Sequence, residues 1–225
     1  MDWFPLWNSL RIAAISTVII FFLSIYAAWK IARMPKFLKG FLDVILTLPL
    51  VLPPTVVGFF LLKLLGPYSA IGSLVLRYFE SRLVMEWYSA IFSSVIVAFP
   101  LMYRTARGAF ESFDPDLKAA GQTLGMSNAR VFWQIVMPTC RQGVIAGCVL
   151  AFARALGEYG ATSMIAGYTP GQTATISTTV YQLWRTGDDY HAAVWVLINL
   201  AISAMVLLVI NSLESQNLRR KTVKV

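Results

Sequence analysis

Charged residues are scarce in this chain, and their scarcity already excludes most soluble folds. Asp, Glu, Lys and Arg make up 13% of the 225 residues, whereas a soluble domain usually carries about a quarter. Apolar residues make up 57% and gather in runs long enough to cross a bilayer. The composition therefore predicts an all-α membrane protein that crosses the bilayer several times.

Residues suited to metal, redox or hydrolytic chemistry are also few. The chain has two cysteines, Cys140 and Cys148, and a single histidine, too few for a disulfide framework or a zinc site. It has no Gly-x-x-x-x-Gly-Lys-Ser/Thr loop for ATP phosphates, no His-Glu-x-x-His and no Gly-x-Ser-x-Gly. We therefore expect no catalytic residue, metal or cofactor, and any energy for an active process must come from a partner chain.

Apolar runs of about 20 residues each match the length that a ~30 Å hydrocarbon core requires. The five predicted spans are 11–31, 42–65, 84–103, 142–165 and 191–212. The stretch 68–80 is too short and too charged to cross, and we interpret it as an external loop with some helix. We therefore expect one transmembrane domain over residues 1–225.

Positive charge predicts the orientation of the spans. Most of the 19 Lys and Arg residues lie in 30–39, in 104–141 and after Glu214, among them Lys224. With five spans, all three segments fall on one side, and the positive-inside rule places that side in the cytoplasm. We therefore expect the N-terminus outside and the C-terminus inside. The excess charge of +8 lies beside the spans, which favours membrane lipids over nucleic acid as its partner.

The longest stretch that is too polar to be a membrane span is 116–138. It lies within a predicted cytoplasmic loop at 114–138. Asp114, Pro115 and Asp116 are typical of a helix start. Gly125 is a natural helix stop. Before it, one helix face carries Leu117, Ala120 and Leu124.

Ser127 can cap a second helix, which Pro138 is predicted to close. The first helix has only small side chains at three successive positions, Ala119, Ala120 and Gly121. Another backbone or the wall of a groove can therefore approach it closely. Two interpretations remain open from these residues alone. The loop either lies flat on the membrane as an amphipathic segment or serves as a docking surface.

Prolines interrupt the second predicted span. Pro53 and Pro54 free backbone carbonyls and kink a helix, and Gly58 follows one turn later. The kink either lines a transport path or only packs against protein. We favour the path because Thr55 supplies a hydroxyl beside it, and we assign Thr162 of the fourth span to the same path.

Arg154 and Glu158 lie one helical turn apart within the fourth span. Ionisable residues at such depth are usually functional or paired. We interpret them as a structural ion pair rather than a proton relay, because opposite charges at i and i+4 can neutralise each other.

Two polar groups near the last span each leave two interpretations open. The hydroxyls that follow Gly171 belong either to an outer gate or receptor contact, or to an ordinary polar loop; they are Thr173, Thr175, Ser177, Thr178 and Thr179. Asp188 and Asp189 either contact a soluble receptor or cap the last helix.

The loop resembles the cytoplasmic loop of ABC importer permeases, whose pattern is Glu-Ala-Ala, three residues, Gly, nine residues, Ile-x-Leu-Pro. Matching Gly125 to the glycine places Ala120, Ile135 and Pro138 at their expected positions. Ala119 stands where Glu is usual, and Gly121 where the second Ala is usual. The resemblance implies that the ATPase subunit docks on a surface that includes Ala119, Ala120, Gly121, Leu124, Gly125, Ile135 and Pro138.

Three further stretches resemble the molybdate branch of these permeases, with sulfate permeases as near relatives. They are LPLVLPPTVVGFFLL (48–62), ALGEYGATSMIAG (155–167) and PGQT (170–173). The resemblance implies the type I ABC importer permease fold in the plasma (inner) membrane of a prokaryote. It implies three partners: a second copy of the chain, ATP-binding ABC subunits and an extracytoplasmic oxyanion-binding protein. The implied cargo is molybdate, with tungstate or sulfate as alternatives. A self-sufficient ion-coupled transporter or a membrane enzyme remains the alternative of another class.

Overall fold

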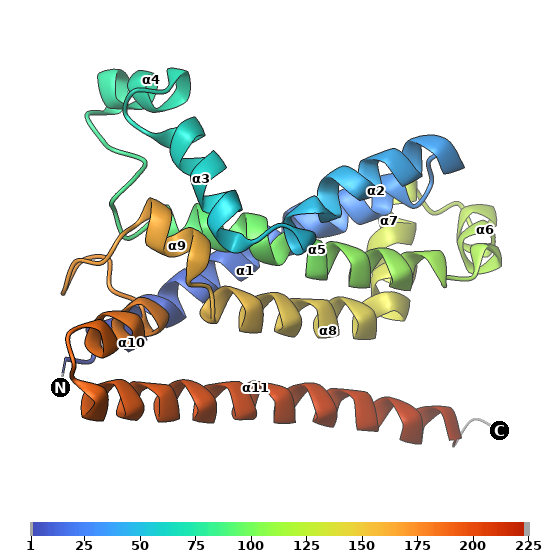
Figure 1. Ribbon diagram of the computed structural model, residues 1–225. Helices are drawn as coiled ribbons and strands as arrows, with labels where there is room; N and C mark the ends of the chain where they lie inside the picture. The colour runs from blue at the N-terminus through green and yellow to red at the C-terminus, as the bar shows by residue number, and fades with distance from the viewer. Residues whose placement is uncertain (1, 223–225) are drawn as a thin grey trace.

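The chain folds into helices, the longest of which run between two ends of the molecule (Figure 1). The computed structural model describes residues 2–222, and no strand occurs among them. Four stretches are long and apolar enough to cross a bilayer: α1 (Phe4–Ile31), α5 (Ser89–Glu111), the run Asn128–Leu156 that includes α8 (Met137–Leu156), and Asp189–Val206 of α11 (Asp189–Thr222). A fifth results if α2 (Lys36–Val51) and α3 (Pro54–Leu65) count as one broken span. The predicted all-α membrane protein is confirmed, with four to five candidate spans.

The second predicted span, 42–65, is broken rather than kinked. α2 and α3 are bent by 108° relative to one another. Leu52 and Pro53 between them have extended backbone, with ψ of 141° and 133°. Because proline pushes the preceding residue into the extended region, Pro53 and Pro54 impose this conformation twice in succession. Pro49 stays inside α2, so the paired prolines make the break.

The fourth predicted span, 142–165, is also two helices, so the prediction of one continuous span was wrong. α8 ends at Leu156, and α9 (Gly160–Ile165) begins after a short turn. Gly157, the residue after α8, is a poor helix former. The Glu158 carboxylate accepts a hydrogen bond from the Ala161 N–H at 2.8 Å, which satisfies a free donor at the start of α9.

The centre of the bundle is α5, which packs against α1 and α8. Buried small residues are Ala13, Ser16, Ser24 and Ala28 on α1, and Ala90, Ser93, Ser94, Ala98 and Ala106 on α5. In a membrane, helices associate through close van der Waals packing, and small side chains let their backbones approach. The sequence of α5 therefore suits the middle position.

The short helices gather at the two ends of the bundle. The N-terminus, α4 (Ala70–Phe79) and α10 (Ile176–Arg185) lie at one end, whereas α6 (Pro115–Thr123) and α7 (Asn128–Val131) lie at the other (Figure 1). The helix predicted within 68–80 is confirmed by α4. α11 ends near the α6 end of the bundle (Figure 1). Lys224 of the predicted basic tail lies outside the described residues.

Three hydroxyls of the threonine-rich loop, those of Thr173, Thr175 and Thr178, form hydrogen bonds within the chain. Thr175 caps α10 in a reciprocal pair with Thr178. Asn8 of α1 donates to the Ala174 carbonyl at 2.9 Å, and Ser9 accepts from the Ile176 N–H at 2.9 Å. These bonds fasten the loop to α1.

The first turn of α11 contains the second polar group. The Asp188 carboxylate accepts from the backbone N–H of His191 at 3.2 Å, so the capping interpretation of Asp188 is confirmed. The imidazole of His191 also bonds this carboxylate, and these hydrogen bonds lower the pKa of Asp188 below its usual value.

Replacing Thr175 by Val is expected to lower stability by about 1 kcal/mol, because the N-cap hydroxyl of α10 is lost. The measurement is the thermal unfolding midpoint of the protein in detergent. Thr186→Val is the matched control, since the exposed Thr186 hydroxyl only donates back to α10 carbonyls. Equal midpoints for the two variants would contradict the assigned cap.

Candidate functional site

Residues 114–138 form a surface at one end of the bundle (Figure 1). We refer to it as the 114–138 surface. The Asp114 carboxylate accepts from the Asp116 N–H at 2.9 Å at the start of α6, and the Ser127 hydroxyl accepts from the Arg130 N–H at 3.3 Å at the start of α7. Both predicted helix starts are confirmed, and both supply acceptors to N–H groups that have no partner inside the helix.

Gly125 ends the first helix as predicted. Its φ is +78°, which a side chain at this position would disfavour. The Gly125 N–H donates to the Gln122 carbonyl at 2.9 Å, and the Met126 N–H donates to the Gly121 carbonyl at 3.1 Å. Two such bonds are typical of a left-handed helix end, and they hold α6 at a fixed angle to α7.

Gly121 and Ile135 lie inside the surface and hold its parts together. Gly121 is buried, and a Cβ built on it would lie 2.6 Å from Ile135 Cδ1 and 3.2 Å from Val131 Cγ2. A side chain at position 121 would require the end of the Ile135 side chain to shift, so the glycine allows α6 to rest closely on the turn that follows α7. Of the predicted docking residues, these two support the surface rather than face outward.

The outward face of the surface carries small and apolar side chains. Ala119 and Ala120 are exposed, and Leu124 is 83% exposed. Leu117 lies on the same predicted face and is 45% exposed. Such side chains suit contact with a partner through shape and apolar area.

Trp133 is a further exposed residue of this surface, at 58%, which the sequence interpretation missed. Val131 and Ile135 turn inward, so the 3.6-residue period places Trp133 on the opposite side of the helix. The helical period of the sequence from Ser127 onward could therefore have found it.

Pro138 does not close the second helix, and this prediction was wrong. The helical run continues from Asn128 to Leu156, and Pro138 lies in the first turn of α8. A π-helical turn, η1 (Phe132–Val136), precedes it, and the Met137 N–H donates to the Phe132 carbonyl five residues earlier. This wider turn accommodates the missing N–H of Pro138 and its ring, so the helix need not break.

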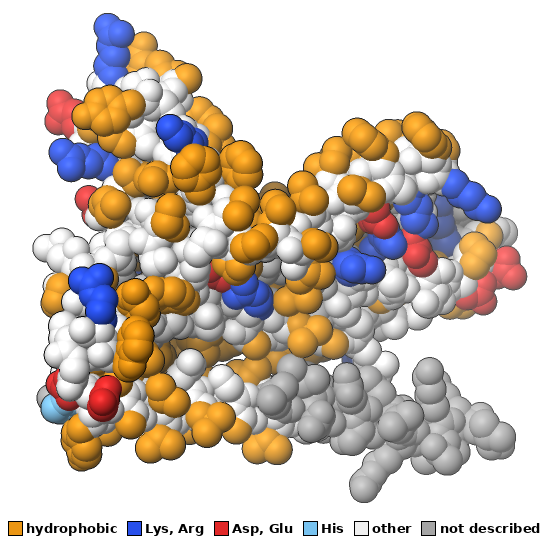
Figure 2. Space-filling view, viewed as in Figure 1, with side chains coloured by type: hydrophobic (Ala, Val, Ile, Leu, Met, Phe, Trp, Pro, Cys, Tyr) orange, Lys and Arg blue, Asp and Glu red, His pale blue; other side chains and the backbone are white. Residues whose placement is uncertain are grey.

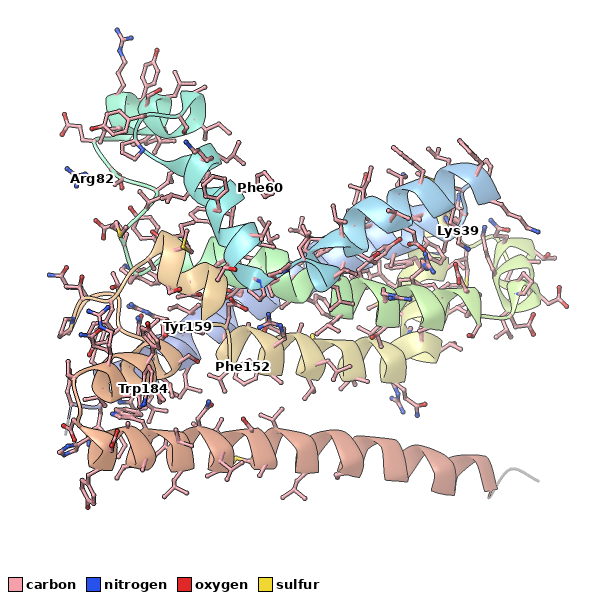
Figure 3. All side chains as sticks on the ribbon, in the orientation of Figure 1. Lys39, Phe60, Arg82, Phe152, Tyr159 and Trp184 are labelled. Atoms are coloured by element: carbon pink, nitrogen blue, oxygen red, sulfur yellow. The ribbon has the colours of Figure 1, made fainter. Side chains whose placement is uncertain are left out.

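An ion cluster joins α2 to α5 beside the 114–138 surface. Arg107 pairs with Asp43 of α2 and, at 3.5 Å, with Glu111; Lys39 also pairs with Glu111. The Tyr103 hydroxyl donates to Asp43 at 2.6 Å. Figure 3 shows Lys39 on α2, near α6. Asp43, an acid at the edge of the second predicted span, was the sequence signal for this cluster.

The predicted path residues fall into two groups. Pro53 and Thr55 are exposed at the break between α2 and α3, where Pro54 is half-buried. Gly58 is buried, and a Cβ on it would lie 2.8 Å from Ala161 Cα, so it allows α3 to pack on α9.

Thr162 is also buried, and its hydroxyl hydrogen-bonds that of Ser93 on α5 at 2.9 Å. Gly58 and Thr162 thus hold helices together within one chain. The path assignment of all five residues stays a prediction.

Arg154 and Glu158 form the expected ion pair within one chain. The Glu158 side chain is 1% exposed, whereas the Arg154 side chain is 29% exposed. In the sequence the pair lies between Phe152 on α8 and Tyr159 at the turn into α9, which are both labelled in Figure 3. The pair therefore lies at the α8–α9 break.

These features define a class of protein before any comparison is made: a multi-span helical membrane protein with interrupted spans and an apolar surface at one end. The sequence pattern of the family described as binding-protein-dependent transport system inner membrane component matches residues 20–221, and the chain belongs to this family. It is accordingly a non-catalytic, multi-pass permease component of the inner membrane.

Relatives and solved structures agree with this assignment. The chain is 37% identical to the molybdenum transport system permease protein ModB of Escherichia coli strain K12, over 92% of this chain and 91% of the relative. It is 38% identical to ModB of Haemophilus influenzae, over 96% and 93%. The fold is similar to that of a bacterial ABC transporter for alginate import, with a TM-score of 0.71 at 20% identity, over 95% of this chain and 78% of that one.

Asp43→Asn and Arg107→Gln are expected to destabilise non-additively, because each removes one side of the same ion pair. A double-mutant cycle from equilibrium unfolding in mixed micelles should give a coupling energy of about 1–3 kcal/mol. Lys36→Gln is the matched control, since Lys36 is exposed on α2 one turn before Lys39. Additive effects of Asp43→Asn and Arg107→Gln would show that the pair contributes nothing.

Proposed function

We propose that this chain is the membrane-spanning permease of an ATP-driven importer of molybdate. The observation that carries the proposal is its similarity, over nine-tenths of both chains, to permeases named for molybdenum transport. Molybdate, tungstate and sulfate are all tetrahedral dianions, so the choice among them depends largely on the extracytoplasmic binding protein. Molybdate is the proposed cargo because the relatives carry that name.

The chain is oriented with its N-terminus outside and its C-terminus in the cytoplasm. Lys39, Arg107 and Arg130 all lie at the end of the bundle that carries α6. The positive-inside rule favours the cytoplasm for such an end. This orientation makes the 114–138 surface accessible to a cytoplasmic partner.

The ATP-binding subunits dock on the 114–138 surface. Its exposed Ala119, Ala120 and Leu124 offer a smooth apolar face, and Trp133 adds a large aromatic side chain of the kind enriched at interfaces. Ala119 stands where related loops carry Glu. Docking therefore depends on shape and apolar contact rather than on charge at this position.

Two copies of the chain form the transport path between them. Pro53 and Thr55 are exposed on the single chain, so a path at these residues needs a second wall. Hydrophobic side chains cover α2 and α3 on both sides of the notch between these helices (Figure 2). None of the α2 residues is fully buried, so this helix offers apolar surface to a second copy or to lipid.

ATP binding closes the two ATPase subunits, and the paired 114–138 surfaces move with them. This movement opens the path outward, where the binding protein delivers the anion. The test is ATP hydrolysis by the reconstituted complex of permease, ATPase and binding protein, with the three anions in competition. Molybdate should stimulate hydrolysis in preference to sulfate. Uptake by the permease alone, without an ATPase, would overturn the proposal in favour of an ion-coupled carrier.

Ala120→Trp is expected to abolish co-purification with the ATPase subunit, because an indole ring at position 120 would clash with the wall of the ATPase groove that receives this surface. Ala193→Trp is the matched control, since Ala193 is also exposed but lies in the first turns of α11 at the opposite end. It should retain the ATPase. Retention by both variants would place the docking site elsewhere.

A further inference from the structure

The Arg154–Glu158 pair is asymmetric, and the asymmetry indicates what each partner does. One Glu158 oxygen faces Arg154, and the other accepts the Ala161 N–H at 2.8 Å, so a carboxylate that is 1% exposed uses both oxygens inside the protein. Arg154 has five N–H donors and remains 29% exposed. The carboxylate thus belongs to the fold, while part of the guanidinium is open to its surroundings.

The depth of Arg154 along α8 argues against lipid as its surroundings. Counted along the helix from Arg141, Arg154 lies about 20 Å further on, inside a hydrocarbon core of ~30 Å. A cation exposed to lipid at that depth is costly, and such residues almost always face a water-filled cavity or another protein chain. The open side of Arg154 therefore faces a passage or a neighbouring subunit.

Two interrupted spans meet at this place. A Cβ on Gly160, at the start of α9, would lie 2.9 Å from Pro54 Cβ and 3.2 Å from the Thr55 nitrogen, so the α8–α9 break packs on the α2–α3 break. Gly157, in the turn after Arg154, is exposed. Non-helical backbone at membrane depth is tolerated where it is buried in protein or lines a water-filled cavity. Gly157 and Thr55 are exposed on the single chain, so this backbone is open to a cavity between two copies.

We propose that Arg154 contacts the oxyanion during its passage, with Glu158 holding the guanidinium in place. The planar guanidinium fork matches two oxygens of a tetrahedral oxyanion. The Glu158 carboxylate neutralises the positive charge of the Arg154 guanidinium. The anion is therefore bound by directed hydrogen bonds but not trapped, as conduction requires. This inference rests on the proposed function and identifies the residue that meets the cargo.

Chemical accessibility provides the first test. Cys140 and Cys148 are replaced by Ser, Arg154→Cys is combined with Glu158→Gln, and the complete complex is reconstituted in vesicles. A membrane-impermeant, negatively charged methanethiosulfonate should label this cysteine, because the position faces a passage open to small anions. The control is Ala151→Cys, one turn earlier on α8 and fully buried, which should stay unlabelled. An unreactive cysteine at position 154 would overturn the inference.

Transport provides the second test. Arg154→Gln combined with Glu158→Gln leaves no unpaired charge, and the glutamine carbonyl can still cap α9. Molybdate moved per ATP hydrolysed should fall at least tenfold, and Arg154→Lys should lie between this variant and the wild type. Transport within twofold of the wild type would overturn the inference.

Failure of the inference differs from failure of the proposed function. If the wild-type complex shows no molybdate-stimulated ATP hydrolysis, the proposed function itself fails. If the wild-type complex transports molybdate and the variants transport it equally well, only the inference fails. Should the paired glutamine variant not assemble with the ATPase, the accessibility experiment decides by itself.

Discussion

Satisfying backbone hydrogen bonds inside the bilayer is the constraint on which the rest of this structure depends. Unbroken helices meet it by themselves, and each break must meet it with other groups. At the α8–α9 break, Glu158 accepts the Ala161 N–H, and at the far end of α9 the Ile165 carbonyl accepts from the Met85 N–H at 2.8 Å. The Pro53 carbonyl accepts from Val56 and Val57 at the start of α3. The chain can thus interrupt two spans because partners stand at each interruption.

The sequence was most informative where local chemistry decides the structure. The Asp114 and Ser127 caps, the Gly125 stop and the interruption at the paired prolines all follow from backbone geometry that a single residue controls. The approximate number of spans follows equally well from hydropathy, because a bilayer sets a fixed helix length.

The sequence was least informative where packing between distant segments decides. The α8–α9 break lies inside an apolar run. A hydropathy pattern therefore does not reveal the turn, which one buried carboxylate stabilises. The inward position of Gly121 depends on Ile135 and Val131, and that of Thr162 on Ser93 of α5. The sequence shows that Asp43 is an acid near a predicted span, but only the fold shows that it pairs with Arg107.

The continuity of the helix through Pro138 has a mechanical consequence. A helix that ended there would give the 114–138 surface a hinge, and a push on it would be absorbed locally. Instead, the helical run continues from Asn128 through η1 to Leu156 without an interruption. One end carries Trp133 of the exposed surface, and the other carries Arg154 beside the break.

The ion cluster supplies a second physical connection, because Arg107 and Glu111 of α5 hold the start of α2, whose far end is the other break. The 114–138 surface is therefore connected to both breaks through helices and ion pairs. Close contacts join the breaks to each other, since Gly160 packs on Pro54. The two interrupted spans are accordingly packed against each other at their breaks.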